Sequence, residues 1–155
     1  MAKKPELTLR VRAMQSLARR EYSRAELHAK LLPYASPEDN LDAVLDELVA
    51  RGWLSDARAA EQMVRTRRSR FGAQRIAHEL KQKGISDDLI SAALPQLKQG
   101  ELEAAREVWQ KKFGTMPQDA KEKAKQMRFL QSRGFSLDVV FKVMKFAGSA
   151  EDEGD

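Results

Sequence analysis

RTRRSRFGAQRIAHELKQKGIS, residues 65–86, is the stretch from which the rest of the sequence can be ordered. It carries five arginines and two lysines on either side of a single Phe-Gly pair. Its second half has Ile76 and Leu80 at helical spacing and then Gly84, a pattern typical of an amphipathic helix that ends in a glycine. The stretch therefore predicts a helix, a turn and a second helix, with an apolar side and a strongly basic side.

The end of this stretch recurs fifty residues later. Residues 80–90, LKQKGISDDLI, align with residues 130–140, LQSRGFSLDVV, so that a leucine, a base, a glycine, a serine and an aspartate recur in register. Helical patterns elsewhere give nine short helices in three groups, and each helix is too short to be stable without its neighbours. We expect an all-α protein, an elongated and curved array of three three-helix repeats at residues 7–54, 55–97 and 100–147, with a disordered acidic tail at 148–155.

Local patterns predict several boundaries and core positions. The apolar positions of the first helix form one stripe, which consists of Leu7, Val11, Met14, Leu17 and Ala18. Residues 23–26, SRAE, have the form of a capping box, and Gly52 is placed to end the third helix in the left-handed conformation. Residues 36–39, SPED, combine an N-cap serine, a first-turn proline and first-turn acids, which predicts the start of the third helix. Pro95 is expected to end the sixth helix.

The composition limits the classes of function. The absence of cysteine removes disulfides, thiol nucleophiles and cysteine-bound zinc, and it indicates a reducing compartment. No apolar run has the length of a signal peptide core or a membrane span, so we expect a cytoplasmic protein without membrane contact. The two histidines, His28 and His78, fall on different predicted helices, and phosphate-binding glycine motifs are missing. We expect no enzyme activity, no metal and no cofactor.

Charge is the main functional signal. The formal net charge is +5, and residues 58–83 hold eight lysines and arginines against two acids, whereas residues 37–57 hold six acids against one arginine. Basic faces of this kind favour a polyanion or an acidic protein surface as partner, although a solubilising, helix-stabilising set of charges is the alternative. Several guanidiniums are expected to converge on phosphates or carboxylates. The predicted nucleoprotein-binding residues are Arg65, Arg67, Arg68, Arg70, Arg75, Lys81 and Lys83.

Four stretches resemble the RecX family, whose members regulate the RecA recombinase. They are LARREYSRAEL at 17–27, LDELVARGWLSD at 45–56, FGAQRI at 71–76 with ELKQKGI at 79–85, and KQMRFLQSRGFS at 125–136. The resemblance extends from about Leu9 to Phe146, and it rests on the order and separation of the stretches. One departure is Ala59, where the family usually has an aromatic residue.

The resemblance implies a non-enzymatic protein that binds along the groove of the RecA filament on single-stranded DNA, and we expect it to be a monomer. There the family typically inhibits ATP hydrolysis, strand exchange and coprotease activity, and it limits filament growth. In this chain the predicted arginines would contact DNA phosphates or acidic residues of the filament and bridge neighbouring protomers. The residues alone leave two alternatives open. One is a free-standing DNA-binding regulator with a helix-turn-helix built from the fourth and fifth helices, and the other is a general protein-interaction solenoid.

Overall fold

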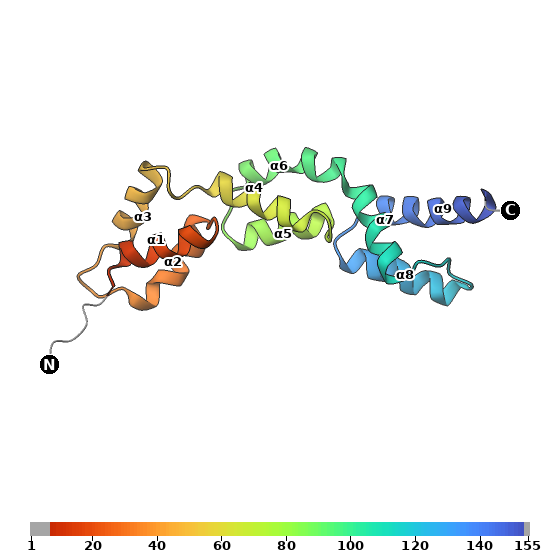
Figure 1. The fold of residues 1–155 in the computed structure, drawn as a ribbon, viewed down its shortest axis with the longest axis horizontal. Coiled ribbons are helices and arrows are strands. Elements are labelled where there is room, and N and C mark those ends of the chain that lie inside the picture. The colour runs from red at the N-terminus through yellow and green to blue at the C-terminus, as the bar shows by residue number, and fades with distance from the viewer. Residues whose placement is uncertain (1–6, 154–155) are drawn as a thin grey trace.

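The computed structural model describes residues 7–153, with side chains for residues 7–145, and this part of the chain contains helices and turns but no strand. Its elements are α1 (Leu9–Arg19), α2 (Arg24–Leu31), the 3-10 helix η1 (Leu32–Tyr34), α3 (Leu41–Ala50), α4 (Asp56–Arg67), α5 (Ala73–Gln82), α6 (Asp87–Gln99), α7 (Glu101–Lys112), α8 (Ala120–Ser132) and α9 (Leu137–Glu153). They form an elongated, curved array with the two ends of the chain far apart (Figure 1). The predicted all-α array of three-helix repeats is confirmed.

Three separate apolar cores lie along the array. The core of α1–α3 includes Leu27, Leu31, Leu45, Leu48 and Leu54. The core of α4–α6 includes Val64, Phe71, Ile76, Leu80, Ile85 and Leu97. The core of α7–α9 includes Trp109, Leu130, Phe135, Val140 and Val143. Because each group buries its own apolar residues, the stability of the whole depends on each core and on the junctions between neighbouring groups.

Local signals set several helix ends as predicted. Ser23 forms the capping box, since its Oγ accepts from the Glu26 amide at 3.0 Å and the Glu26 carboxylate accepts from the Ser23 amide at 3.0 Å. Gly52 follows α3 with a φ of 75°. The Trp53 amide then donates to the Leu48 carbonyl at 2.9 Å, which closes the end of α3 as a Schellman motif.

The predicted start of the third helix is wrong. α3 begins at Leu41 with Asn40 as its N-cap, because Asn40 Oδ1 accepts from the Ala43 amide at 3.0 Å. Ser36 and Asp39 form a separate turn before it, in which the Asp39 carboxylate accepts from the Ser36 amide at 2.8 Å. The pattern of a helix start was therefore present, but the turn that it forms is not continued into a helix.

The predicted end of the sixth helix is also wrong, because α6 runs through Pro95. Proline inside a helix costs about 3 kcal/mol, since it removes a backbone N–H and crowds the preceding turn. Leu97, two residues later, is only 4% exposed and belongs to the second core. Burial of this side chain offsets much of the proline cost and holds the last turn in helical form.

At the C-terminus, α9 continues to Glu153. The backbone of residues 148–153 is therefore helical where the sequence predicts disorder, and residues 154–155 of the predicted tail lie outside the described part of the chain. Extending an existing helix costs far less than starting one, which favours continuation through this segment.

The predicted apolar stripe of the first helix lies mostly outside the core, because of its five residues only Leu17 packs against the first core. α1 packs with Leu9, Ala13 and Ser16 buried, whereas Val11 and Met14 are 40% and 42% exposed. Small side chains at Ala13 and Ser16 allow a close approach to the neighbouring helices, and the Ser16 hydroxyl donates to the Arg12 carbonyl, which satisfies its polar group. Of the larger apolar side chains of α1, Leu9 and Leu17 therefore face the core, whereas Val11 and Met14 lie on the outer face.

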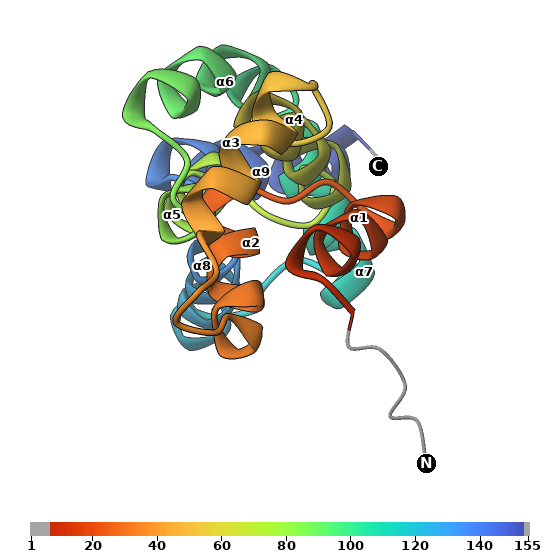
Figure 2. The ribbon, with the colours of Figure 1, turned by 90° about the vertical axis from the view of Figure 1, so that its left-hand side faces the viewer.

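The middle helices of the three groups, α2, α5 and α8, follow one another along one side of the array. They run along the lower side in Figure 1 and overlap in the end-on view of Figure 2. The Ser23 hydroxyl at the start of α2 donates to the Lys83 carbonyl after α5, and the Gly72 amide at the start of α5 donates to the Arg133 carbonyl after α8 at 2.8 Å. The positive end of one helix dipole thus meets the negative end of the next, which stabilises both junctions.

Candidate nucleic-acid interface

The junction between the second and third groups gathers cations around Phe71, which lies in the turn between α4 and α5. The guanidinium carbons of Arg67, Arg70, Arg75 and Arg133 lie 5.6, 5.8, 4.2 and 5.4 Å from the centroid of its ring. The face of an aromatic ring attracts cations, so Phe71 helps to hold together guanidiniums that repel one another. Three of these four arginines were predicted from the sequence, and Arg133 comes from the end of α8.

One carboxylate neutralises part of this cluster. Glu79 lies between two guanidiniums, with its Oε1 3.4 Å from Arg75 Nε and its Oε2 3.6 Å from Arg67 Nε. Arg75 also donates through Nη1 to the Ser132 carbonyl at 3.3 Å. Arg67 and Arg75 are thus oriented by protein contacts, while the other two guanidiniums keep their charge available.

Beside Phe71, a groove of about 280 Å³ opens between the end of α4, α7 and the end of α8. This junction groove is lined by Ser69, Arg70, Glu107, Val108, Lys111, Lys112, Phe129 and Arg133. The Phe129 ring packs edge-on against Phe113 with centroids 5.5 Å apart, and Lys112 Nζ and the Arg133 guanidinium lie 5.3 and 5.1 Å from its centroid. The groove therefore has an apolar floor and a cationic wall.

The cations of the junction groove outnumber its acids four to one. Within the described residues, no carboxylate oxygen lies within 4.0 Å of the charged nitrogens of Arg70, Lys111, Lys112 or Arg133. Guanidinium and ammonium groups that converge without carboxylate partners are suited to phosphate oxygens, which accept charge-assisted hydrogen bonds. This groove is the candidate site for a polyanion.

The structure does not bring all seven predicted residues together. Arg67, Arg70 and Arg75 lie around Phe71, whereas Arg65 and Lys81 are exposed outside the cluster. The remaining two are also elsewhere: Arg68 lies against Gly100 at the link between α6 and α7, and Lys83 lies at the other junction, where its Nζ is 3.3 Å from Glu26 Oε2.

Sequence reasoning missed Arg133, Lys111 and Lys112. Arg133 had a usable signal, because it stands opposite Lys83 in the fifty-residue repeat and so occupies the equivalent helix end. The two lysines are in the last turn of α7, where a cation is favoured by the helix dipole whether or not it binds a ligand. Only the packing of α7 against α8 shows that they face the same groove.

The junction between the first and second groups is electrically balanced. Burial raises the pKa of the Glu26 carboxyl, but the amide of Ser23, the guanidinium of Arg20 at 3.1 Å and the charge of Lys83 outweigh it and hold that pKa below its usual value. Ala59 lines a groove of about 410 Å³ at this junction. The charges here pair with one another, unlike those of the junction groove.

We expect Glu26→Gln to change how stability depends on pH. The carboxylate, with its lowered pKa, stabilises the fold above the pKa of the unfolded chain, near 4.5, and that stabilisation is lost as the pH falls through the lower pKa of the folded chain. Glutamine still accepts from the Ser23 amide but carries no charge. In chemical denaturation, the variant should therefore be less stable by about 1 kcal/mol at neutral pH and converge with the wild type in acid. A stability difference between Glu26→Gln and the wild type that stays the same at every pH would contradict a stabilising role for the Glu26 charge.

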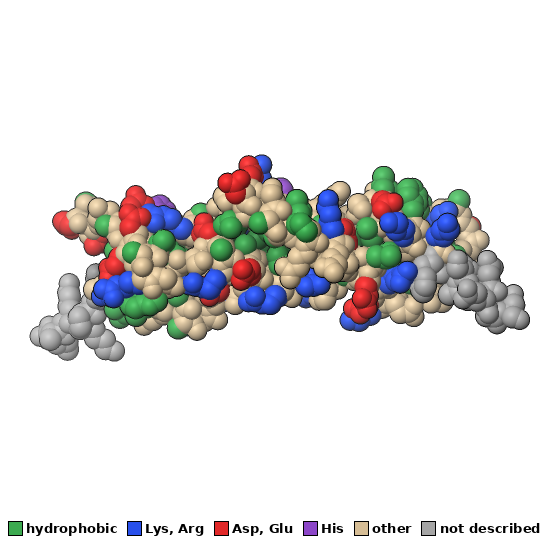
Figure 3. All heavy atoms as spheres, turned by 90° about the horizontal axis from the view of Figure 1, so that it is seen from above, with side chains coloured by type: hydrophobic (Ala, Val, Ile, Leu, Met, Phe, Trp, Pro, Cys, Tyr) green, Lys and Arg blue, Asp and Glu red, His purple; other side chains and the backbone are tan. Residues whose placement is uncertain are grey.

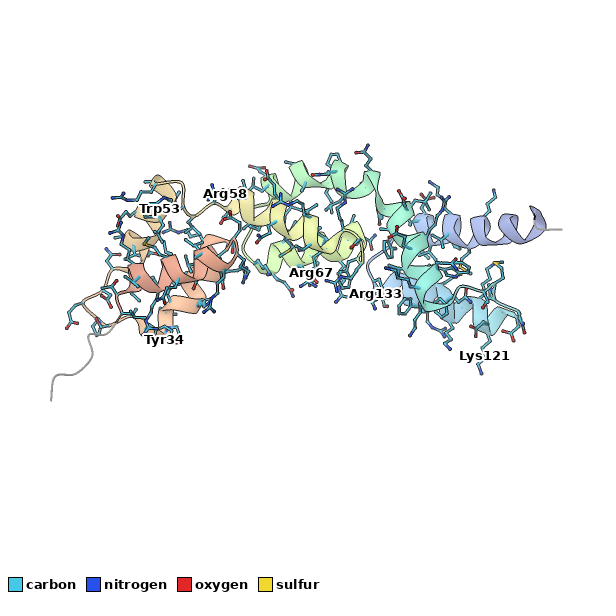
Figure 4. The ribbon with its side chains drawn as sticks, viewed as in Figure 1. Tyr34, Trp53, Arg58, Arg67, Lys121 and Arg133 are labelled. Carbon is cyan, nitrogen blue, oxygen red and sulfur yellow. The ribbon has the colours of Figure 1, made fainter. Side chains whose placement is uncertain are left out.

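The described surface is not uniformly basic. In Figure 3, which looks onto the upper face, lysine, arginine and acidic side chains are interspersed along the molecule. In Figure 4, Arg67 and Arg133 lie on the lower side of the array, as do Tyr34 and Lys121, whereas Trp53 and Arg58 lie on the upper side. Of the four unpaired cations of the junction groove, Figure 4 labels Arg133, which lies on the side formed by α2, α5 and α8.

Two general findings bear on the class of site. Among the described helices, none is long and apolar enough to cross a membrane. Within the part of the chain whose side chains are described, no three histidine, aspartate or glutamate residues are placed to hold a metal ion.

Comparison with known proteins relates the chain to one family. The sequence models of the second and third three-helix domains of RecX match residues 55–94 and 99–144. The regulatory protein RecX of Leptothrix cholodnii is 50% identical over 149 residues, which cover 96% of this chain and 95% of the relative. That of Chromobacterium violaceum is 48% identical over 146 residues, or 94% and 93% of the two chains. The crystal structure of RecX from Lactobacillus salivarius matches with a TM-score of 0.77 at 23% identity, over 90% of this chain and 94% of that one.

Proposed function

We propose that this chain, which belongs to the RecX family of regulatory proteins, binds the RecA filament on single-stranded DNA and reduces its ATPase, strand-exchange and coprotease activities. RecX is a family of regulators and not of enzymes, so binding has to account for the effect. The observation that carries the proposal is the junction groove, where four cations from three helix ends converge without carboxylate partners among the described residues.

The groove supplies contacts to the nucleic acid of the filament. Arg70 and Arg133 would each donate paired hydrogen bonds to phosphate oxygens, and Lys111 and Lys112 would add point charges. Phe129 would offer an apolar edge to the strand between its phosphates. The other predicted cations that lie outside the groove would add attraction at longer range, which speeds association.

The elongated shape accounts for regulation. An array of three groups along one axis can contact more than one recombinase protomer in a filament (Figure 1). ATP turnover in such a filament requires protomers to change their arrangement, and a ligand that binds one arrangement better shifts the population toward it. A bridging protein with higher affinity for an inactive arrangement would therefore lower the rate of ATP hydrolysis.

The double variant Arg70→Glu/Arg133→Glu tests the proposal. We expect its affinity for a single-stranded oligonucleotide to fall about tenfold. The slope of the logarithm of the affinity against the logarithm of the salt concentration should also become less negative by about 1.4, because each lost phosphate contact removes about 0.7 from it. Inhibition of RecA ATP hydrolysis on single-stranded DNA should be lost at ratios where the wild type inhibits. Fluorescence anisotropy over a salt series and a coupled ATPase assay measure the two effects.

The matched control is Arg19→Glu/Lys98→Glu, which makes the same charge change at exposed positions outside the junction groove. It should keep binding and inhibition close to those of the wild type. If the control loses as much as the test variant, net charge rather than the groove determines binding. Full inhibition by the Arg70→Glu/Arg133→Glu variant would overturn the proposal.

The helix-turn-helix alternative has less structural support. A helix-turn-helix protein presents the N-terminal residues of its second helix to the bases of duplex DNA. Here the start of α5 is covered by the next group, since the Gly72 amide donates to the Arg133 carbonyl and the Arg75 guanidinium donates to the Ser132 carbonyl. Tight, sequence-selective binding to duplex DNA without recombinase would favour that alternative.

A further inference from the structure

The two tyrosines of the chain lie in opposite environments. Tyr22 is 7% exposed and belongs to the first core, and its hydroxyl accepts from Lys30 Nζ at 3.0 Å. Tyr34 is 56% exposed, the largest exposed fraction among the large hydrophobic residues whose side chains the structure describes. Its hydroxyl has no hydrogen-bond partner within the described residues. The ring of Tyr34 therefore has no structural role in the core and is available to a ligand.

Tyr34 is held on a short turn beside an arginine. It ends the 3-10 helix η1, in which Pro33 precedes it and the Ala35 amide donates to the Leu32 carbonyl at 3.1 Å. The Arg12 guanidinium of α1 lies 3.9 Å from the centroid of the Tyr34 ring. Among the described residues, no carboxylate oxygen lies within 4.0 Å of the charged nitrogens of Arg12. Because the proline and the stacked guanidinium already fix the ring, little conformational freedom is lost when a second flat group packs on it.

Tyr34 lies on the same side of the array as the cations of the junction. In Figure 4, Tyr34, Arg67 and Arg133 all lie on the lower side, along which α2 and α5 follow one another. These two helices carry Lys30 and Lys81, which are exposed and have no carboxylate oxygen within 4.0 Å of their charged nitrogens in the described part of the chain. A strand that leaves the junction groove along this side therefore passes helices whose lysines can attract its phosphates.

This combination favours a single-stranded nucleic acid. Every base has a flat face, so an exposed aromatic ring beside cations binds single strands by stacking, with little regard to sequence. A duplex keeps its bases within its own stack and has none to offer the ring. The next acids of the chain after Tyr34 are Glu38 and Asp39, and both accept from the Ser36 hydroxyl at 3.1 Å, which holds them in the turn that follows η1.

We propose that Tyr34, backed by Arg12, stacks on a base of the same strand whose phosphates bind at the junction groove. This inference rests on the proposed function and extends the nucleic-acid interface from the second and third groups to the first. α5 has 10 residues and α2 has 8, so the two helices together span about 27 Å at about 1.5 Å per residue. At about 3.4 Å per nucleotide, a strand needs about eight nucleotides to cover that span. Only a longer oligonucleotide can reach both places.

Oligonucleotide length separates this contact from the junction groove. Fluorescence anisotropy over a salt series measures the affinities for single-stranded oligonucleotides of about 5 and about 20 nucleotides, below and above the length that spans the two places. Tyr34→Ala removes the ring, whereas Tyr34→Phe removes only the hydroxyl. Phe141→Ala is the matched control, because Phe141 is also an exposed aromatic residue, at 54%, but lies in α9 of the third group. Both positions are largely exposed, so the fold should survive, as thermal unfolding would show.

We expect Tyr34→Ala to bind the long oligonucleotide about tenfold more weakly than the wild type, and the short one with an affinity within about twofold. The slope of the logarithm of the affinity against the logarithm of the salt concentration should not change, because no charged contact is lost. Tyr34→Phe and Phe141→Ala should match the wild type with both oligonucleotides.

Wild-type affinity of Tyr34→Ala for the long oligonucleotide would overturn the inference and leave the proposed function standing. Equal losses with both lengths would also overturn it, because the change would then act on the junction groove or on the fold. A loss in Tyr34→Phe as large as that in Tyr34→Ala would do the same, because the hydroxyl and not the ring would make the contact. A wild type that binds neither oligonucleotide would overturn both the inference and the proposed function.

Discussion

Gly72→Ala is expected to separate the second and third groups of helices while leaving each apolar core intact. Gly72 has an ordinary φ of −79°, so alanine brings no backbone strain of its own. Its Cβ, however, would collide with the carbonyl of Gly134 across the junction. That atom belongs to the backbone and cannot rotate away, and the bond from the Gly72 amide to the Arg133 carbonyl would be broken as well. A loss of about 3 kcal/mol is expected, at the upper end of the range for overpacking.

Gly52→Ala provides the matched control for this variant. Gly52 has a φ of 75°, and a Cβ there would meet no atom within 4 Å, so the substitution adds only left-handed strain of about 1–2 kcal/mol. In chemical denaturation, Gly72→Ala should unfold in separate steps, because the third group loses its neighbour. The denaturation curve of Gly52→Ala should keep the shape of the wild-type curve, with its midpoint shifted to a lower denaturant concentration.

The Gly72→Ala variant should also bind single-stranded DNA poorly, since Arg133 reaches the junction groove only when the third group is docked. X-ray scattering should show a more extended or more variable molecule. A single unfolding transition with wild-type DNA affinity would contradict the view that this contact joins the two groups.

The array of repeats was predictable because its signals are local. A left-handed glycine at a helix end, with the serine that caps the next helix two residues later, is written into a few adjacent positions, and it recurs as Gly84-Ile85-Ser86 and Gly134-Phe135-Ser136. The capping box at Ser23 and the glycine after α3 are equally local. The predicted end of α6 failed through a longer-range effect, the burial of Leu97 that carries the helix past its proline, whereas the predicted start of α3 failed locally, because Asn40 and not Ser36 caps the helix.

The two apolar faces of α1 show a limit of periodicity. The spacing of large apolar residues located a stripe correctly, but it did not say which face of the helix the core would take. Ala13 and Ser16 are buried because they are small enough for close packing, a property that depends on α2 and α3 and not on α1 alone. Val11 and Met14 of the stripe are therefore exposed, while Leu17 packs against the first core.

The candidate site was predictable in composition and not in geometry. The sequence shows how many arginines the stretch 65–86 contains, but it does not show which of them find carboxylates. Glu79 pairs with Arg67 and Arg75, and Glu26 pairs with Lys83, which lies 57 residues further along the chain. Arg133 reaches Phe71 only through the contact between the second and third groups, so the cations that remain unpaired are determined by the junctions.

The third group contains a buried polar contact that the repeat pattern does not predict. Gln126 is 1% exposed and stands fifty residues after Ile76, which is apolar and buried in the second group. Its Oε1 accepts from Trp109 Nε1 at 2.8 Å, and its Nε2 donates to the Thr115 carbonyl at 3.1 Å. A single amide side chain thus satisfies the buried indole N–H of Trp109 and also bonds to the carbonyl of Thr115, an exposed residue.

Gln126→Ala should therefore destabilise the third group by about 3 kcal/mol, because the Trp109 indole N–H and the Thr115 carbonyl lose their partners and a cavity opens beside them. Gln126→Leu fills the cavity but still leaves the indole N–H unpaired, so it should cost less than alanine. In the Trp109→Phe variant, which lacks that N–H, adding Gln126→Leu should lower the free energy of unfolding only slightly further. Chemical denaturation of the four proteins of this cycle gives the coupling energy, and additive effects would contradict the role of the bond.

The bond between Trp109 and Gln126 also affects DNA binding, because of where the two residues lie. Trp109 is in α7, three residues before Lys112, and Gln126 is in α8, seven residues before Arg133. The bond between them fixes the two helices whose ends supply cations to the junction groove. Gln126→Ala should thus lower the affinity for single-stranded DNA although neither residue touches the groove, while the Gln126→Leu/Trp109→Phe double variant, with α7 and α8 still packed, should bind like the wild type. Equal DNA affinity in all variants would show that the groove does not depend on this packing.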